Sequence, residues 1–227
     1  MSGDDTIQKI VFDESSNVRT CQDFELGDVP FDTIYAVQHQ FAFRWFLDAH
    51  FNSGTPFPGK DDPGVYACVD VGSQFNFVVN MSAFANFVMS EPILNFEGGN
   101  RVIPDLGMFF IDQEAQNMSS LYDGQMRLLT SLHAIEHFGL GRYGDTVDPL
   151  GDIKGLKEFN RVLCHNGLFI GSVPVDIRGK ERVDFNRNRV YSVDLVRKML
   201  HESGFSVVRN IVAVTCPHLI KESVNNE

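Results

Sequence analysis

The sequence predicts an α/β fold, with a doubly wound, mostly parallel sheet and a leader helix ahead of it. Two observations predict this class. Short apolar runs rich in β-branched and aromatic residues alternate with helical segments in the second half of the chain, and one long helical pattern precedes the first of these runs. Strands that alternate with helices form parallel sheets covered on both faces, and right-handed crossovers make such a sheet doubly wound.

The composition indicates one folded domain. The chain has 227 residues, of which 43% are hydrophobic and 22% charged, so it is long enough for one sizeable core and short for two. We expect a single globular unit, in which residues 1–60 form a tail and leader helix packed on an α/β domain at residues 61–227.

The net charge and the amino-terminal sequence limit the classes of binding partner and the cellular compartment that we expect. A formal net charge of −11 disfavours a nucleic-acid surface, because phosphate binding begins with a basic patch. The start "MSGDDTIQ" is polar and acidic, unlike a signal peptide, and no apolar run approaches the roughly 18 residues of a membrane span. Four scattered cysteines indicate reduced thiols. We therefore expect a cytoplasmic protein that binds a small molecule rather than nucleic acid or a membrane.

In chain order, the leader helix comes first. Residues 30–51 carry apolar side chains at helical spacing, Trp45 among them, and the turn-forming stretch at 52–64 ends the pattern. Short apolar runs then predict four strands, with a helix or loop at 112–124 before the last of them: residues 65–73, 84–91, 100–105 and 126–133.

The second half begins with the clearest helix. Residues 148–167 place Pro149 near the helix start, carry apolar residues on one stripe and stop at Asn166-Gly167. The elements expected after it are a strand at 168–175, an arginine-rich loop, a capped helix at 192–205 and a strand at 206–216.

In such a sheet, ligands bind beyond the carboxyl ends of the strands. The turn Asp70-Val71-Gly72-Ser73 follows the first strand, and Gly72 would let the backbone approach a ligand. Glu91 lies 21 residues after Asp70, near the ~20 expected for an acid that holds ribose hydroxyls. The further glycines of a G-x-G-x-x-G loop are missing, so phosphate cradling by this turn is disfavoured.

The run "SLHAIEHFGLGRYGD" at 131–145 allows two interpretations. His133, Glu136 and His137 spell H-x-x-E-H, the inverted zinc-protease signature. Such a zinc site needs about two helical turns and a third ligand, whereas Gly139 and Gly141 leave room for about one turn. We therefore favour a loop at the sheet edge, in which glycines let the backbone turn closely around a ligand.

Other residues of this edge are candidates for binding substrate. Arg142 and Tyr143 would lie over the ligand, and Asp145 is a weaker candidate for a base. In the arginine-rich loop, Arg187 and Arg189 together with Tyr191 could hold an anionic group through bidentate bonds.

Several motifs resemble those of the class I S-adenosylmethionine-dependent methyltransferases, which have a Rossmann-like sheet. They are "VDVGS", "IPDL", "LLTSLHAIEHFG" and "LKEFNRVLCHNGLFIGSVPV". In addition, "SLHAIEHFGLGRYGD" together with "FNRNRVYS" is similar to an uncharacterised methyltransferase-like family, a domain of unknown function with a GLGRYGD signature. The resemblance covers roughly residues 65–208.

The resemblance implies a cofactor, S-adenosylmethionine, and roles for individual residues. Asp70, Gly72 and Ser73 would line its methionine and ribose part, Glu91 its ribose hydroxyls, and Asp105 its adenine amino group. On the substrate side, the resemblance implies a general base, either His137 or His133, with Glu136 as its orienting partner, and a binding loop formed by Gly139, Gly141, Arg142, Tyr143 and Asp145.

Each of these residues also has a structural interpretation. Asp70 could cap the turn that follows it, Asp105 could cap a helix, and the histidines could be satisfied by backbone carbonyls. Arg142 could pair with Asp145 or Asp148, and the arginines of the later loop could form a solvated face.

Three hypotheses follow for the function. The first is an S-adenosylmethionine-dependent methyltransferase acting on a small or glycan-type polar acceptor, with no metal expected. The second is a catalytically inactive methyltransferase-fold protein that binds or scaffolds. The third is a metal-dependent hydrolase. An open pocket between Gly72 and Glu136 would favour the first, and one plugged by Gln74, Phe75 or Phe77 the second.

Overall fold

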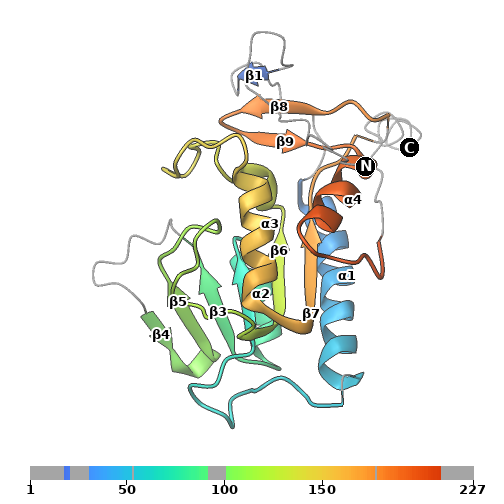
Figure 1. The fold of residues 1–227 in the computed structure, drawn as a ribbon. Coiled ribbons are helices and arrows are strands. Elements are labelled where there is room, and N and C mark those ends of the chain that lie inside the picture. The colour runs from blue at the N-terminus through green and yellow to red at the C-terminus, as the bar shows by residue number, and fades with distance from the viewer. Residues whose placement is uncertain (1–17, 21–30, 53, 92–100, 177, 211–227) are drawn as a thin grey trace, which may run out of the picture.

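The structure, a computed structural model, describes residues 18–20, 31–52, 54–91, 101–176 and 178–210. It contains a six-stranded sheet in the order β4-β5-β3-β2-β6-β7 (Figure 1). Five neighbouring strands of this sheet are parallel, and β4 pairs antiparallel with β5 at one edge. The strands are β2 Cys68–Val71, β3 Phe87–Ser90, β4 Arg101–Ile103, β5 Met108–Ile111, β6 Met126–Leu132 and β7 Leu163–Ser172.

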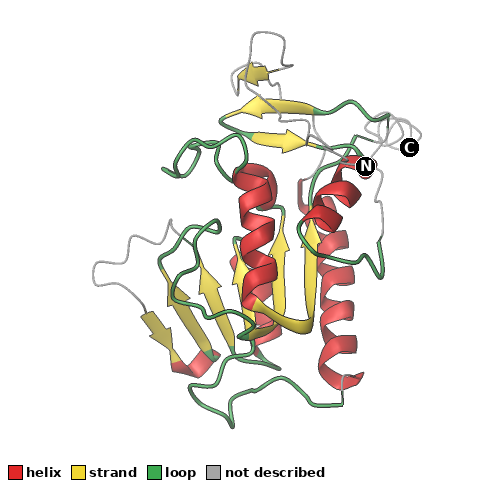
Figure 2. Ribbon diagram, in the orientation of Figure 1, coloured by secondary structure: helices red, strands yellow, loops and turns green. Residues whose placement is uncertain are grey.

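Helices cover both faces of this sheet (Figure 2). One face packs against α1 and α2, and the other against α3 and α4. Their bounds are α1 Phe31–Asn52, α2 Phe75–Ser82, α3 Gly151–Val162 and α4 Val193–Glu202. The predicted fold class, a doubly wound and mostly parallel sheet with a leader helix, is therefore confirmed.

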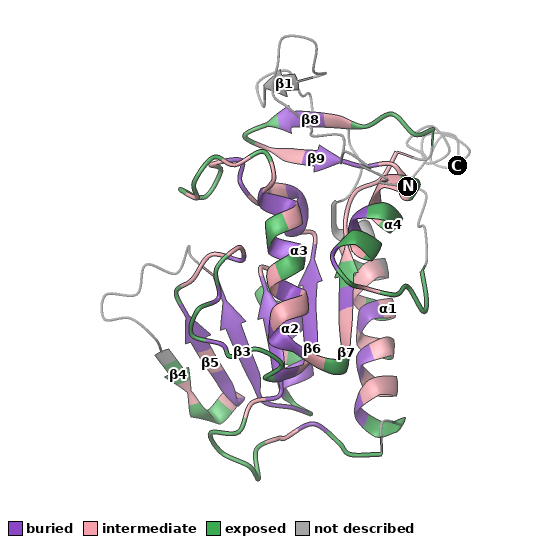
Figure 3. Ribbon diagram, viewed as in Figure 1, coloured by how far each residue is buried: buried purple, intermediate pink, exposed green. Residues whose placement is uncertain are grey.

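The helices form because their apolar residues recur on one face. In α3, Leu156, Phe159 and Val162 are buried against the sheet, as helical spacing requires. The Ser192 side chain accepts a hydrogen bond from the Leu195 backbone N–H at 3.0 Å, which satisfies a free donor of the first turn of α4. Figure 3 shows the resulting pattern, with buried residues along the strands and exposed ones on the outer sides of the helices.

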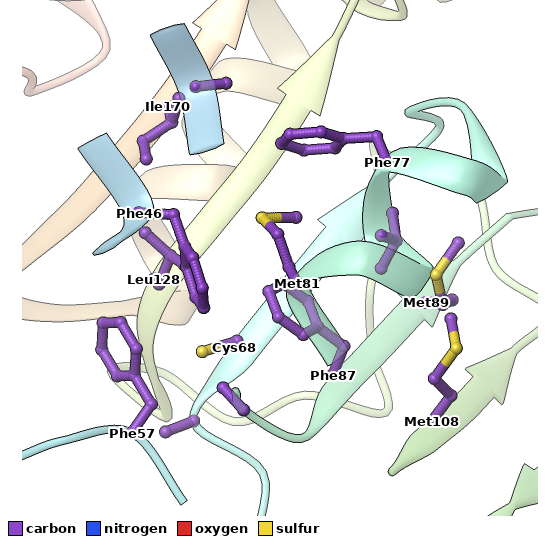
Figure 4. Close-up of a cluster of buried hydrophobic side chains, with 14 of the residues drawn as sticks. Phe46, Phe57, Cys68, Phe77, Met81, Phe87, Met89, Met108, Leu128 and Ile170 are labelled. Atoms are coloured by element: carbon purple, nitrogen blue, oxygen red, sulfur yellow. The ribbon is translucent and has the colours of Figure 1, made fainter. Parts of the chain in front are cut away.

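Aromatic side chains dominate the core between α1, α2 and the sheet. In Figure 4, Phe46 of α1 lies near Phe57 and Phe87, with ring centroids 6.0 Å and 5.9 Å away, respectively. Phe46, Phe87 and the neighbouring Met81 are fully buried. This core accounts for part of the 20 phenylalanines and attaches the leader helix to the domain.

The arginine-rich segment forms a hairpin rather than a loop. Strands β8 Arg182–Phe185 and β9 Asn188–Val190 pair antiparallel, and β1 Val18–Thr20 adds to β8 in parallel. This second sheet lies beyond the carboxyl ends of β6 and β7 (Figure 1). It thereby covers one end of the main sheet.

Some predicted elements differ from the observed ones. The short β5 and the helix α2 were not predicted, β7 begins five residues earlier than expected, and residues 112–124 form turns without a helix. Of the strand expected at 206–216, residues 206–210 have no regular structure, and the remainder lies outside the described residues. Over the described ranges, no helix combines the length and the apolar character needed to cross a membrane.

Candidate functional site

A pocket opens at the carboxyl edge of the main sheet, where the direction of strand succession reverses. The chain runs from β2 to β3 and β5 on one side, then returns to β6 and β7 on the other. Such a reversal leaves a crevice beyond the strand ends. The cavity has a volume of ≈ 100 Å³, and its lining includes Val71, Gly72, Ser90, Glu91, Ala115, His133, His137 and Tyr143.

The turn that follows β2 places main-chain atoms at this pocket. Gly72 has φ +71°, and a Cβ built on it would lie 2.8 Å from the Ala134 Cβ. Glycine is therefore required by both conformation and space. Gln74 and Phe75 are exposed, and Phe77 is buried against α1, stacked on His39 at 4.9 Å between ring centroids. None of these three lines the pocket.

Asp70 is buried beneath the turn instead of facing the pocket. Its carboxylate accepts hydrogen bonds from the Ser73 backbone N–H at 3.0 Å and from the Thr130 hydroxyl. Burial raises the pKa of Asp70 to about 6. The Ser73 hydroxyl in turn accepts a hydrogen bond from the Leu132 backbone N–H at 2.9 Å. Asp70 and Ser73 thus tie the β2 turn to β6, as the structural interpretation of Asp70 anticipates.

Glu91 stands on the wall of the pocket. It follows the last residue of β3, and its backbone N–H donates to the Ile111 carbonyl at 3.2 Å, which holds this strand end against β5. Burial raises the pKa of Glu91. The structure thus places Glu91 at the pocket, and its predicted contact with ribose hydroxyls stays a prediction.

Asp105 is not brought to the pocket. It lies in the exposed turn η2 Pro104–Leu106, which connects β4 to the start of β5. Because β5 is parallel to β3 and β2, its start lies at the opposite edge of the sheet from the pocket. The expectation for Asp105 assumed that a strand of the parallel set ends there, whereas the strand before it is the antiparallel β4. The residues that follow β5 at the pocket are Glu114, Ala115 and Gln116.

The histidines follow β6: His133 comes directly after the strand, and His137 is the last residue of the single turn η3 Ile135–His137. His133 has φ +53°, and its backbone N–H donates to the Ser172 carbonyl at 3.0 Å. Its ring Nδ1 lies 2.8 Å from Oε1 of Glu136, a side chain that is only 2% exposed. Since a carboxylate only accepts, Nδ1 carries the proton and Nε2 has the free lone pair.

His137 has a different partner. Its Nδ1 donates to the backbone carbonyl of Arg187, in the turn of the β8–β9 hairpin, and its Nε2 lies 4.0 Å from Glu136 Oε1. Burial lowers the pKa of His137, so the ring is neutral near pH 7. The ring of Tyr143 meets it edge-on at 5.7 Å between centroids.

Asp145 organises the glycine loop. Its carboxylate accepts hydrogen bonds from the backbone N–H groups of Gly139 at 2.8 Å, Gly141 at 3.3 Å and Tyr143 at 3.2 Å. Both glycines have positive φ. The exposed Arg142 does not take the predicted partner: it donates to the Arg187 carbonyl at 3.2 Å and lies over the Tyr143 ring at 5.3 Å. The loop therefore presents Tyr143 toward the pocket and holds it through Asp145.

Arg189 and Tyr191 are buried, which corrects their prediction as substrate-binding residues. The Arg189 guanidinium is 0% exposed and donates to the backbone carbonyls of Phe138, Asp148 and Pro149. It also pairs with Asp152, to which the Tyr191 hydroxyl donates at 3.0 Å. The hairpin turns these side chains inward, because alternate residues of a strand face opposite sides.

The geometry does not favour zinc on the H-x-x-E-H motif. As expected, only one turn forms after β6, and His133 precedes it in a left-handed conformation. Within the part of the chain that the structure describes, no group of three or more His, Cys, Asp and Glu side chains is arranged to hold a metal ion.

The leader helix contributes residues that the sequence interpretation missed. The Tyr35 ring lies 5.6 Å from that of His133, and the His39 ring 6.2 Å from that of Tyr35. Gln38 Oε1 accepts a hydrogen bond from the Ser172 hydroxyl at 2.8 Å. The signal in the sequence was the helical spacing of these three residues, at i, i+3 and i+4, on one side of the helix, with no local motif to connect them to residue 133.

Comparisons with known proteins concern the fold. A family model described as "Caenorhabditis protein of unknown function, DUF268" matches residues 104–214, just under half of the chain. No curated protein matches the sequence.

Among solved structures, the chain is similar to two S-adenosylmethionine-dependent methyltransferases. The one from Thermotoga maritima has 19% identity and a TM-score of 0.45, with 78% of this chain and 77% of that chain covered. The one from Mesorhizobium loti has 15% identity and a TM-score of 0.45, with 72% and 84% covered. Because these sequence identities and TM-scores are low, we base the fold assignment on the strand order described above.

Proposed function

We propose that the protein is an S-adenosylmethionine-dependent methyltransferase that acts on a small or glycan-type polar acceptor. The observation that carries this proposal is the pocket at the reversal point of the sheet, with the Gly72 backbone and the Glu91 carboxyl on its wall. The sequence resemblance of "VDVGS" and the later motifs to this superfamily supports it. Gln74, Phe75 and Phe77, which would favour an inactive protein if they filled the pocket, do not line it.

The residues present fit the cofactor in part. Glu91 would bind the ribose hydroxyls, and the turn at Val71 and Gly72 would contact the methionine part, while Asp70 and Ser73 would act by holding that turn. The cavity of ≈ 100 Å³ is smaller than the roughly 300–1,000 Å³ of ligand pockets. Binding a nucleoside therefore requires the lining of this cavity to move outward.

When bound, S-adenosylmethionine supplies a methyl group on a sulfonium, which moves to the acceptor as the carbon–sulfur bond breaks and neutral S-adenosylhomocysteine remains. The protein aligns the acceptor and accepts its proton. We assign His133 as the base, because it lines the pocket and because Glu136 fixes its Nδ1 proton at 2.8 Å, which leaves the Nε2 lone pair to accept a proton. The Glu136 carboxylate would also stabilise the imidazolium formed.

Calorimetric titration tests this proposal. The purified protein is titrated with S-adenosylmethionine and S-adenosylhomocysteine, and we expect micromolar dissociation constants, about −8 kcal/mol. Glu91→Ala should abolish the binding heat, whereas Glu181→Ala, at an exposed acid outside the pocket, should retain it. Absence of heat with either ligand in a folded sample would refute the proposal and favour a binding or scaffolding module of the same fold.

A further inference from the structure

His133 has a backbone conformation that a residue with a side chain rarely adopts. Its φ is +53°, in the left-handed region, where the close approach of Cβ to a carbonyl oxygen is unfavourable. Such a conformation persists only where the surrounding structure holds it in place. The direction in which the ring of the proposed base points therefore depends on the groups that bind the His133 main chain.

The last residue of β7 binds this main chain twice. The His133 N–H donates to the Ser172 carbonyl oxygen at 3.0 Å and to the Ser172 hydroxyl oxygen at 3.1 Å. The pairing of β6 with β7 ends at the same place, with Leu132 opposite Ser172. The shared hydrogen bond thus fixes the first residue after β6 against the end of β7.

Gln38 of the leader helix fixes the orientation of that hydroxyl. The Ser172 hydroxyl donates to Gln38 Oε1 at 2.8 Å. A serine hydroxyl has one hydrogen, which rotates to suit its surroundings. Because Gln38 takes this hydrogen, a lone pair of the oxygen is left for the His133 N–H. Without the Gln38 oxygen, the hydrogen could rotate toward that N–H, and the second hydrogen bond would be lost.

The His133 ring is held by other groups. Oε1 of Glu136 lies 2.8 Å from Nδ1, and the Tyr35 ring meets the imidazole edge-on at 5.6 Å between centroids. The ring stays on Glu136 only while the His133 main chain keeps its conformation. Neither Gln38 nor Ser172 lines the pocket at the sheet reversal, so an effect of these two residues on the base would act through His133.

We propose that Gln38 and Ser172 are positioning residues for the base: they hold the His133 main chain in its left-handed conformation and thereby keep the ring on Glu136. This inference rests on the proposed function, which assigns His133 as the base. It gives α1 a part in the geometry of the site in addition to its part in the core.

Two pairs of variants test the inference. Ser172→Ala removes the hydroxyl, and Gln38→Met removes the oxygen that accepts its hydrogen. Ser172→Thr and Gln38→Glu keep these groups and should restore the behaviour of wild type. Gln40→Met is the matched control, because it makes the same change at an exposed position of the same helix. Circular dichroism and thermal melting establish which variants are folded, and where Ser172→Ala is not, Gln38→Met decides.

The readout is the position of the ring proton of His133 in the protein without ligand. Long-range proton–nitrogen NMR at about pH 8, where a free imidazole is neutral, distinguishes a ring protonated at Nδ1 from one protonated at Nε2. His133→Asn identifies the signals among those of the seven histidines. In wild type and Gln40→Met, the Nδ1 form should exceed the other about tenfold, as a hydrogen bond to a carboxylate provides. In Ser172→Ala and Gln38→Met this excess should fall to about threefold or less.

His137 is the internal control. Its Nδ1 donates to the Arg187 carbonyl, so its signals should be the same in every variant. Unchanged His133 signals in both Ser172→Ala and Gln38→Met overturn the inference. Equal changes at His133 and His137, or a change in Gln40→Met, also overturn it, because they would indicate a general loss of packing.

Failure of this inference is distinguishable from failure of the proposed function. The NMR measurement needs no ligand, whereas calorimetry with S-adenosylhomocysteine tests donor binding. The variants at positions 38, 40 and 172 should bind that ligand like wild type, because none of these positions lines the pocket. A protein that shows the expected His133 response and binds no S-adenosylhomocysteine refutes the methyltransferase and retains the link between α1 and His133.

Discussion

Arg189 donates a hydrogen bond to the backbone carbonyl of Phe138 at 2.6 Å, and this contact ties the second sheet to the turn that carries the histidines. The same guanidinium pairs with Asp152 of α3 at 3.5 Å. One buried side chain therefore joins β9, α3 and the start of the glycine loop. This joint lies directly after the turn that ends at His137.

Replacement of Arg189 by methionine should destabilise the protein by roughly 3–5 kcal/mol, because it leaves the buried Asp152 carboxylate and several backbone carbonyls without their partner. Urea unfolding measures the loss. The control is Arg197→Met, whose ion pair with Asp194 is exposed and 4.0 Å long; such a change is expected to stay within about 0.5 kcal/mol. Equal losses in the two variants would contradict the buried joint.

The buried carboxyl group of Asp70 should make the stability of the protein depend on pH. Burial raises its pKa in the folded state to about 6, above the ~3.9 of an unfolded aspartate. The folded state thus binds this proton more tightly than the unfolded state does. The free energy of unfolding is therefore higher at low pH and falls as the pH rises from about 4 to 6. The loss is at most roughly 3 kcal/mol, from 1.36 kcal/mol per pKa unit.

Asp70→Asn should remove this dependence, because the amide stays neutral and can still bond Ser73 and Thr130. Free energies of unfolding measured between pH 4 and pH 7.5 should show wild type losing stability relative to the variant as the pH rises. The exposed Asp105→Asn provides the control for the loss of one carboxyl group elsewhere in the chain. A constant difference between Asp70→Asn and wild type over this range would refute the assignment.

The glycine loop should tolerate a side chain at one glycine and not at another. Gly139 and Gly144 both have positive φ, but a Cβ at Gly139 would lie 2.2 Å from the Asp148 carbonyl oxygen, whereas nothing lies within 4 Å at Gly144. Gly144→Ala should cost about 1 kcal/mol for its backbone conformation. Gly139→Ala should cost clearly more, about 3 kcal/mol, as thermal unfolding of the two variants would show.

The two histidines should differ in catalysis. If His133 is the base, His133→Asn should lower kcat by about 10²–10⁴-fold with any acceptor that the protein methylates. His137→Asn should lower it less, because burial lowers the pKa of His137 and makes it a weaker base, and because the Glu136 carboxylate contacts His133 at 2.8 Å but lies 4.0 Å from His137 Nε2. Radiolabelled methyl transfer measures both. A larger loss for His137→Asn would reverse the assignment.

The sequence predicted four of the five parallel strands and the helices α1, α3 and α4, because each lies in a pattern several residues long. Met108–Ile111 escaped notice since a four-residue strand after Gly107 offers no periodicity to recognise. The helix at Phe75–Ser82 was missed because its apolar residues continue those of the adjacent strands. The strand before Asp105 is the antiparallel β4, which the sequence interpretation took for a parallel strand. Asp105 was therefore expected at the wrong edge of the sheet.

At the candidate site, the sequence predicted residues that follow a strand and missed those brought in by tertiary packing. Gly72, Glu91, His133 and His137 lie at the pocket because strand ends of a parallel sheet meet at one edge. Whether they bind cofactor and substrate stays a prediction. Nothing local in the sequence indicated that Arg189 points inward, since a hairpin and a solvated loop have similar composition.

The hydrogen bond between Gln38 and Ser172 spans 134 positions of the chain, and this has a consequence for biosynthesis. During translation, α1 leaves the ribosome long before β7 exists, and its polar face has no sheet edge to contact until then. Contacts of such long range are formed slowly. The contact between α1 and β7 can therefore form only after about three quarters of the polypeptide has been made, so a stalled or truncated chain would carry the leader helix without its partner strand.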